Sequence, residues 1–127
     1  MDYSPEVRRR FFGPNCFGDW ESKPGEVFQG SAQDTTQGVW VRFDAQIAHG
    51  RVAAVRYQTF GCPHTVAAAS AVAEGWMGAA VGQPPVFDVR RVADDLAVPV
   101  EKLGRLLLVE DAARRCWSAM DKREIEE

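Results

Sequence analysis

The chain has 127 residues, 46% of them hydrophobic and 26% charged, which is a typical balance for one globular domain. Its formal net charge of −3 provides no overall positive field, and this disfavours a nucleic-acid partner. No apolar run reaches the roughly 20 residues of a membrane-spanning helix. Three cysteines without a paired framework fit a reducing compartment. We therefore expect a soluble cytoplasmic protein with a single domain over residues 1–127.

The N-terminal part, residues 1–37, is predicted to hold a short helix followed by a loop. Ser4 precedes Pro5, which is a typical helix start, and the sequence "GPN" at 13–15 ends the helix. The stretch that follows is rich in Gly, Ser, Asn, Gln and Asp and has no sustained period. A loop is expected there, with a short strand near residues 26–29.

Residues 38–60 are predicted to form an antiparallel hairpin. Over residues 39–47, apolar and polar side chains alternate, which gives a strand with one apolar face. The sequence "AHG" at 48–50 is typical of a tight turn. A second strand is expected over residues 51–59.

The remaining helical part is predicted over residues 63–123. Pro63 suits a first helical turn, the alanines after it favour a helix, and Gly82 ends that helix. A short helix is expected within 86–96, and a last helix from Pro99 onward. Along the last helix one predicted stripe of residues recurs at spacings of 3 and 4, with Cys116 expected on the apolar face: Leu107, Leu108, Asp111, Ala112, Arg115, Cys116 and Ala119. This order predicts an α+β fold, a small antiparallel sheet covered on one face by helices.

Three separated segments carry a family resemblance. They are the opening "DYSPEVRRRFFGPNCFG", the junction "VAAVRYQTFGCPHTVAAASAVAEGWMGAAV" and the later "VPVEKLGRLLLVEDAARRC". In this order they resemble the iron–sulfur cluster assembly scaffold family of the IscU/NifU type. The resemblance implies a scaffold and not an enzyme, with a [2Fe–2S] cluster or iron as its cofactor. It also implies protein partners, such as a cysteine desulfurase or other assembly factors, and allows a homo-oligomer.

The cluster ligands of that family are mostly altered in this chain. The family holds its cluster with three cysteines, helped by an aspartate and a histidine. The middle cysteine matches Cys62, the Cys and Asp of a Cys-Gly-Asp fall on Gln37 and Val39, and a His-Cys pair falls on Gly104 and Arg105. One thiolate cannot hold a cluster that usually takes four ligands. Arg105 could instead pair with the Cys62 thiolate or with a bound anion.

Four residues are candidate metal ligands. Cys62 lies at a predicted helix N-terminus, where the dipole favours a thiolate that binds metal or accepts sulfur; the alternative is a buried small hydrophobe. His64 is a second ligand or a solvated residue at the helix start. Cys16 and Asp19, in "NCFGDW", would complete a zinc or iron site if their loop reaches Cys62. Otherwise Cys16 packs among aromatic side chains.

Pro99 and Lys102 match a proline–lysine segment that family members present to a partner, although a glutamate departs from the pattern between them. Three functions therefore stay open. The first is a scaffold-like protein that binds iron or a cluster through Cys62. The second is a protein of the same fold that binds a partner without a cluster. The third is a mononuclear zinc- or iron-binding or thiol-reactive protein.

Overall fold

The computed structural model describes residues 3–12, 27–36, 38–83 and 88–126. Its elements, in chain order, are α1 (Pro5–Phe12), β1 (Val27–Asp34), β2 (Val39–Ala48), β3 (Arg51–Phe60), α2 (Pro63–Trp76), α3 (Val89–Leu96), the short 3-10 helix η1 (Val100–Lys102) and α4 (Leu103–Glu126). The strands form one antiparallel sheet in the order β1-β2-β3. The predicted α+β class is confirmed.

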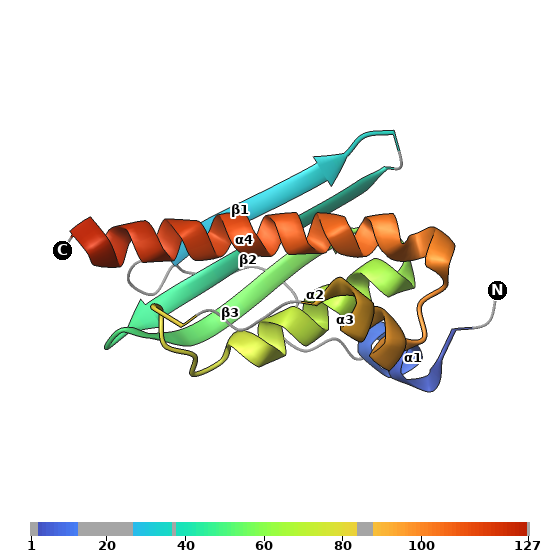
Figure 1. The fold of residues 1–127 in the computed structure, drawn as a ribbon, viewed down its shortest axis with the longest axis horizontal. Coiled ribbons are helices and arrows are strands. Elements are labelled where there is room, and N and C mark those ends of the chain that lie inside the picture. Colours follow the sequence, from blue (N-terminus) through green and yellow to red (C-terminus); the bar gives the residue numbers. More distant parts are fainter. Residues whose placement is uncertain (1–2, 13–26, 37, 84–87, 127) are drawn as a thin grey trace.

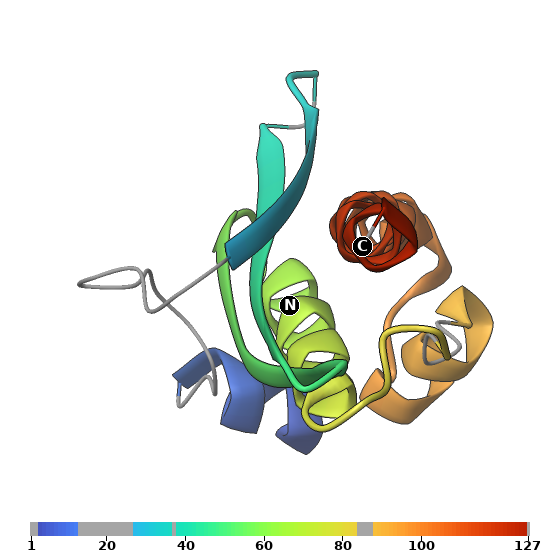
Figure 2. The ribbon, with the colours of Figure 1, turned by 90° about the vertical axis from the view of Figure 1, so that its left-hand side faces the viewer.

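One face of the sheet carries the helices (Figures 1 and 2). Helix α4 packs across β1 and β2, and α2 packs against β3. Side chains from alternate positions of the strands fill the layer between sheet and helices; among them are Val41, Phe43, Ala45, Val55 and Tyr57, all fully buried. The period-2 pattern of the hairpin therefore predicted the correct inner face for β2.

Strand β1 is longer than the short strand predicted near residues 26–29. It pairs with β2 along its whole length, from Val27 opposite Gln46 to Asp34 opposite Val39. Its sequence, VFQGSAQD, lacks a clear apolar alternation because Gly30 lies where the backbone of α4 comes closest. A Cβ at Gly30 would lie 2.6 Å from the Cα of Cys116, so a glycine is required there.

The predicted turn at 48–50 is confirmed. His49 and Gly50 both have positive φ, 57° and 73°, as the two central residues of a type I′ hairpin turn require. A register shift lies between Gln46 and Ile47 just before this turn. The shift changes which residues of β3 face inward. The buried residues Val52, Val55 and Tyr57 therefore do not follow one strict alternation along the strand.

Helix α2 ends at Trp76, six residues before the predicted end at Gly82. The chain returns to the start of β3: the Gly78 N–H donates to the Val52 carbonyl, and the Val52 N–H donates to the Ala79 carbonyl, both at 2.9 Å. Gly78 has a φ of 80°, which lets the chain leave the helix. The helix therefore ends because the chain after it pairs with the start of β3. Local helix propensity cannot predict this end, since that part of β3 lies more than twenty residues earlier in the sequence.

The buried stripe of α4 is shifted from the predicted one. Ala112 and Cys116 are buried as expected, but Leu107 is 52% exposed, and Asp111 and Arg115 are exposed. Arg115 instead donates a hydrogen bond to the Ser31 carbonyl of β1 at 2.7 Å. The buried side chains are Leu106, Val109, Ala112, Ala113, Cys116, Trp117 and Met120. The prediction used the spacing of residues alone. The buried face of α4 is decided by its contacts with both the sheet and α2.

Side-chain caps fix two of the shorter helices. The Ser4 hydroxyl accepts from the Val7 N–H at 3.2 Å, which confirms the predicted start of α1, and donates to the Leu96 carbonyl at the end of α3. The Asp88 carboxylate accepts from the Arg90 N–H at 3.0 Å and so caps α3. Across the residues described, no helix is both long and apolar enough to cross a bilayer.

Candidate functional site around Cys62

Segments distant in sequence meet at one end of the fold. Strand β3 ends and α2 begins at Cys62, and α4 begins nearby, at the right-hand end of Figure 1. Because Trp40 pairs with Phe60, the start of β2 lies at the same end. This end, called the Cys62 end below, therefore collects the matched positions Cys62, Val39, Gly104 and Arg105.

Cys62 is the N-cap residue of α2. Its backbone is extended, with φ −80° and ψ 168°, and its carbonyl accepts from the N–H groups of Thr65 at 2.9 Å and Val66 at 3.2 Å. Pro63 follows at the first helical position, where a missing N–H does no harm. The Sγ atom of Cys62 lies 3.6 Å from the Thr65 hydroxyl oxygen. The thiol is thus held in place, and it remains partly exposed.

The surroundings of Cys62 favour its thiolate. Burial raises the pKa of the thiol, but opposing effects together lower it below its ordinary value. They are the hydrogen bond with the Thr65 hydroxyl, the backbone N–H groups of Thr65 and His64, and the positive charge of Arg105. Cys116 behaves in the opposite way, because burial and the charge of Asp44 raise its pKa to about 12. Cys116 is therefore an inert core residue.

His64 is buried, with 1% of its surface exposed, so the alternative of a solvated residue at the helix start is wrong. Its ring meets that of Tyr3 edge to face, with centroids 4.9 Å apart. Burial lowers the pKa of His64, and the charges of Lys102 and Arg105 lower it further, against the opposing charge of Glu101. The imidazole is therefore held in its neutral form.

Two basic residues occupy the end of η1 and the start of α4. Lys102 closes η1, where its N–H donates to the Pro99 carbonyl at 2.9 Å. Arg105 is partly buried, and its Nε atom is buried without a hydrogen-bond partner in the described structure. The neighbouring Gly104 is exposed and faces open space, while Val39 is 3% exposed at the start of β2. An apolar side chain and a glycine thus stand where the resemblance implies ligands.

The described residues do not fit the family's cluster-binding set. Among them, no group of three or more His, Cys, Asp or Glu side chains could hold a metal ion. Arg105 acts on Cys62 as a positive charge, whereas metal ligands are neutral or anionic. The candidates Cys16, Asp19 and the matched position Gln37 lie outside the described residues.

Two apolar side chains near the Cys62 end are exposed. Phe60, two residues before Cys62, is 73% exposed, and Val100 in η1 is 80% exposed. A contiguous patch of such side chains is typical of surfaces that bind other proteins, whereas single exposed apolar side chains are common. The sequence contained a signal for Phe60, because its place in the alternation of β3 puts it on the face opposite Tyr57, away from the helices.

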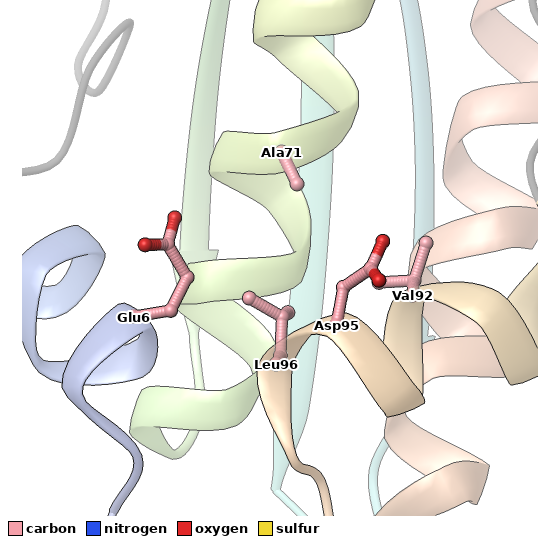
Figure 3. A pocket seen from close by; sticks show the side chains of 5 residues that line it. All are labelled: Glu6, Ala71, Val92, Asp95 and Leu96. Carbon is pink, nitrogen blue, oxygen red and sulfur yellow. The ribbon is translucent and has the colours of Figure 1, made fainter.

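A separate concavity of about 350 Å³ lies between α1, α2 and α3 (Figure 3). Glu6 of α1 and Asp95 of α3 border it, with Ala71 and Leu96 between them. Glu6 is paired with Arg9 at 2.7 Å, which reduces the negative charge that the concavity presents. None of its lining residues belongs to the Cys62 end.

A three-stranded antiparallel sheet with helices on one face, and a half-buried cysteine at a strand-to-helix junction, define the class of this protein as a small α+β domain. Residues 2–127 match the profile of the family described as "NifU-like N terminal domain". The chain therefore belongs to the NifU-like N-terminal domain family, as the sequence resemblance predicted.

The similar proteins are consistent with this family. The chain is 24% identical over 115 residues to the iron–sulfur cluster assembly scaffold protein IscU of Azotobacter vinelandii, covering 90% of each chain. It is 26% identical to the IscU of Rickettsia prowazekii, covering 90% of this chain and 88% of that one. Among solved structures, a putative scaffold protein for the SUF system from Fervidobacterium islandicum has a TM-score of 0.68 at 14% identity, covering 91% of this chain and 96% of that one. A NifU-like protein from Brucella abortus has a TM-score of 0.67 at 15% identity, covering 94% of each chain.

Proposed function

We propose that this protein acts in iron–sulfur cluster assembly as a scaffold-like protein that binds assembly partners without holding a cluster on the family's ligand set. The observation that carries the proposal is the positive charge of Arg105, which acts on Cys62 from a position where the resemblance implies a cysteine ligand. Val39 and Gly104 add no ligand at their matched positions. The role is not catalytic, and the compartment is the reducing cytoplasm.

The Cys62 end is the surface that we assign to partners. The exposed side chains of Phe60 and Val100 supply apolar anchors beside the basic residues Lys102 and Arg105. Pro99 and Lys102 keep part of the segment that the resemblance associates with partner binding. A cysteine desulfurase is the first partner to test, and other assembly factors come next.

A second candidate function is the binding of iron or a cluster through Cys62. The lowered pKa of Cys62 favours it, since the thiolate is the form that binds metal. It requires further ligands from outside the described residues, with Cys16 and Asp19 as the candidates, or from a second copy of the chain. A mononuclear zinc or iron site would use the same residues, with His64 as an additional candidate.

The metal and acid-labile sulfide content of protein purified without oxygen separates these functions. Wild type is compared with Cys62→Ser, and Cys116→Ala serves as the control for loss of a thiol in the core. We expect iron and sulfide in wild type to stay at the level of Cys62→Ser. Iron and sulfide in near-equal amounts, lost in Cys62→Ser only, would overturn the proposal in favour of the second candidate. Zinc or iron without sulfide would indicate a mononuclear site.

The partner surface is tested by binding to the cysteine desulfurase of the same organism. Truncation of a central apolar anchor at an interface typically costs about 2 kcal/mol or more, so Phe60→Ser should weaken binding roughly thirtyfold or more. Met77→Ser is the matched control, because Met77 is also exposed, at 47%, but lies at the opposite end of α2. Equal losses in both variants would show that the Cys62 end is not the docking surface.

A further inference from the structure

The concavity between α1, α2 and α3 is open to a small molecule. Its volume of about 350 Å³ lies near the lower end of the roughly 300–1,000 Å³ that is typical of small-molecule sites. Leu96 is 2% exposed, while the other lining residues are partly or largely accessible: Glu6, Ala71, Val92 and Asp95. A ligand can therefore reach these side chains without any rearrangement of the structure.

The lining combines two carboxylates with an apolar surface between them. Asp95 and Leu96 follow Val92 by three and four residues, so all three share the face of α3 that borders the concavity. Glu6 borders it from α1, and the side chains of Leu96 and Ala71 lie between Glu6 and Asp95 (Figure 3). None of the described residues that line the concavity is basic. The surface thus has an anionic group on either side of an apolar middle.

The end of α3 adds negative charge at the concavity. Asp94 and Asp95 lie in the last turn of this helix, which the structure describes in full and which has no basic residue in that turn. The basic residues of α3, Arg90 and Arg91, lie in its first turn. Carbonyl groups give the C-terminus of a helix a partial negative charge, which favours cations and disfavours carboxylates. A cation bound beside Asp95 would therefore relieve an unfavourable arrangement.

The two walls of the concavity are tied together. The Ser4 hydroxyl accepts from the Val7 N–H of α1 at 3.2 Å and donates to the Leu96 carbonyl of α3 at 2.7 Å, so the backbone on both sides of Glu6 is fixed. Glu6 also accepts from the exposed Arg9 at 2.7 Å. Because a carboxylate offers about four lone-pair sites, Glu6 can accept from a second cation while it holds Arg9.

We propose that the concavity binds a linear aliphatic diamine, with one ammonium on Glu6, the other on Asp95 and the methylene chain against Ala71 and Leu96. An ammonium donates charge-assisted hydrogen bonds to a carboxylate, and the methylene chain leaves water for an apolar surface. A metal ion has no apolar part and gains nothing from that surface. The inference does not rest on the proposed function, because no residue that lines the concavity belongs to the Cys62 end.

The charged part of the site is tested by calorimetric titration of the full chain with cadaverine (1,5-diaminopentane) at low ionic strength. We expect saturable binding to one site per chain. Asp95→Asn should weaken it about fivefold or more, because a partly shielded ammonium–carboxylate pair is lost. Asp94→Asn is the matched control: it removes the same charge from the same helical turn, but Asp94 does not line the concavity. Its affinity for cadaverine should stay within about twofold of wild type.

The apolar part is tested by filling the concavity. Ala71→Leu places a larger side chain there at a helical position that leucine suits, so cadaverine should bind about tenfold more weakly or not at all. Gly75→Leu is the control, because it adds a leucine at an exposed position of α2 that meets nothing within 4 Å. Pentylamine, which has a single ammonium, should bind wild type about fivefold more weakly than cadaverine does.

Several outcomes would overturn the inference: no saturable binding to wild type, equal effects of Asp95→Asn and Asp94→Asn, or unchanged binding in a folded Ala71→Leu variant. Pentylamine or Mg²⁺ binding as tightly as cadaverine would also overturn it, because negative charge alone would then explain the affinity. If urea denaturation shows that Ala71→Leu does not fold, the two aspartate variants decide, since both residues are exposed. Failure of the titration leaves the proposed function untouched, because the metal and sulfide measurement depends on Cys62 and not on this concavity.

Discussion

At the scale of single residues, Cys62 and His64 lie two positions apart and have different environments. Cys62 is partly exposed and is stabilised as a thiolate by Thr65, by backbone N–H groups and by Arg105. His64 is buried and held neutral by its burial and by the positive charges of Lys102 and Arg105. The turn that starts α2 explains the difference, because it keeps the N-cap at the surface and directs the second helical residue into the protein.

The thiolate of Cys62 depends on the hydroxyl of Thr65. In Thr65→Val the side chain keeps its shape, but the hydrogen bond to Sγ is lost, so the pKa of Cys62 should rise. The rate of alkylation by iodoacetamide as a function of pH measures this, with Cys62→Ser identifying the signal. Buried Cys116 contributes little to the rate in the folded protein. An alkylation midpoint that does not move in Thr65→Val would contradict this account of the thiolate.

His64 makes stability depend on pH. The pKa of His64 is lower in the folded chain than its ordinary value of 6.5, so the unfolded chain binds the proton more tightly. Stability from this group is therefore fully present above about pH 6.5 and is lost as the pH falls through the folded pKa. His64→Phe keeps a ring against Tyr3 but removes the titration, so its unfolding free energy should fall less between about pH 7 and pH 5.

Urea unfolding at a series of pH values measures this effect. His49→Asn is the control, because His49 lies in an exposed turn at positive φ, a conformation that asparagine also adopts well. The same pH dependence in wild type and His64→Phe would show that other groups cause the acid destabilisation.

At the scale of elements, the backbones of β1 and α4 come close together at Gly30, which has no side chain to separate them. Gly30→Ala would place a Cβ against the backbone of Cys116 and 2.7 Å from the Ala112 carbonyl oxygen. The helix would have to move, so we expect a loss of about 1–3 kcal/mol in unfolding free energy, measured by urea denaturation.

Gly75→Ala is the matched control for this change. Gly75 lies inside α2, and a Cβ there meets nothing within 4 Å. Alanine is favoured over glycine in a helix by about 1 kcal/mol, so the control should be neutral or stabilising. If Gly30→Ala were as stable as Gly75→Ala, β1 would not lie as close to α4 as the structure describes.

At the scale of the whole molecule, α2 and α4 are joined through tryptophans above the sheet. The rings of Trp76 and Trp117 lie 5.2 Å apart and meet edge to face, and Trp76 also contacts Phe43 of β2 at 5.4 Å. The indole N–H of Trp117 donates to the Val81 carbonyl at 3.0 Å, which fixes the segment after α2. These contacts link both helices and the central strand into one core.

Trp117→Phe tests this link. It removes the hydrogen bond to Val81 and part of the ring, so the unfolding free energy should fall by about 2–4 kcal/mol. Tryptophan fluorescence and far-UV circular dichroism are followed during urea denaturation. The two transitions should remain coincident, because α2 and α4 share this core. Separate transitions would contradict a shared core, and a loss below about 0.5 kcal/mol would contradict the contribution of Trp117.

The amino-acid sequence by itself determined the local features of this protein. Alternation gave the inner face of β2 and Ser4 gave the start of α1, because each depends on neighbouring residues. Three separated segments in order, one of them around Cys62, gave the family. Only the tertiary structure decided the length of β1, the end of α2 and the buried face of α4, since contacts with distant segments fix them. It also decided the chemistry of the Cys62 end, because burial of His64 and the charge of Arg105 arise only when α2 and α4 begin side by side.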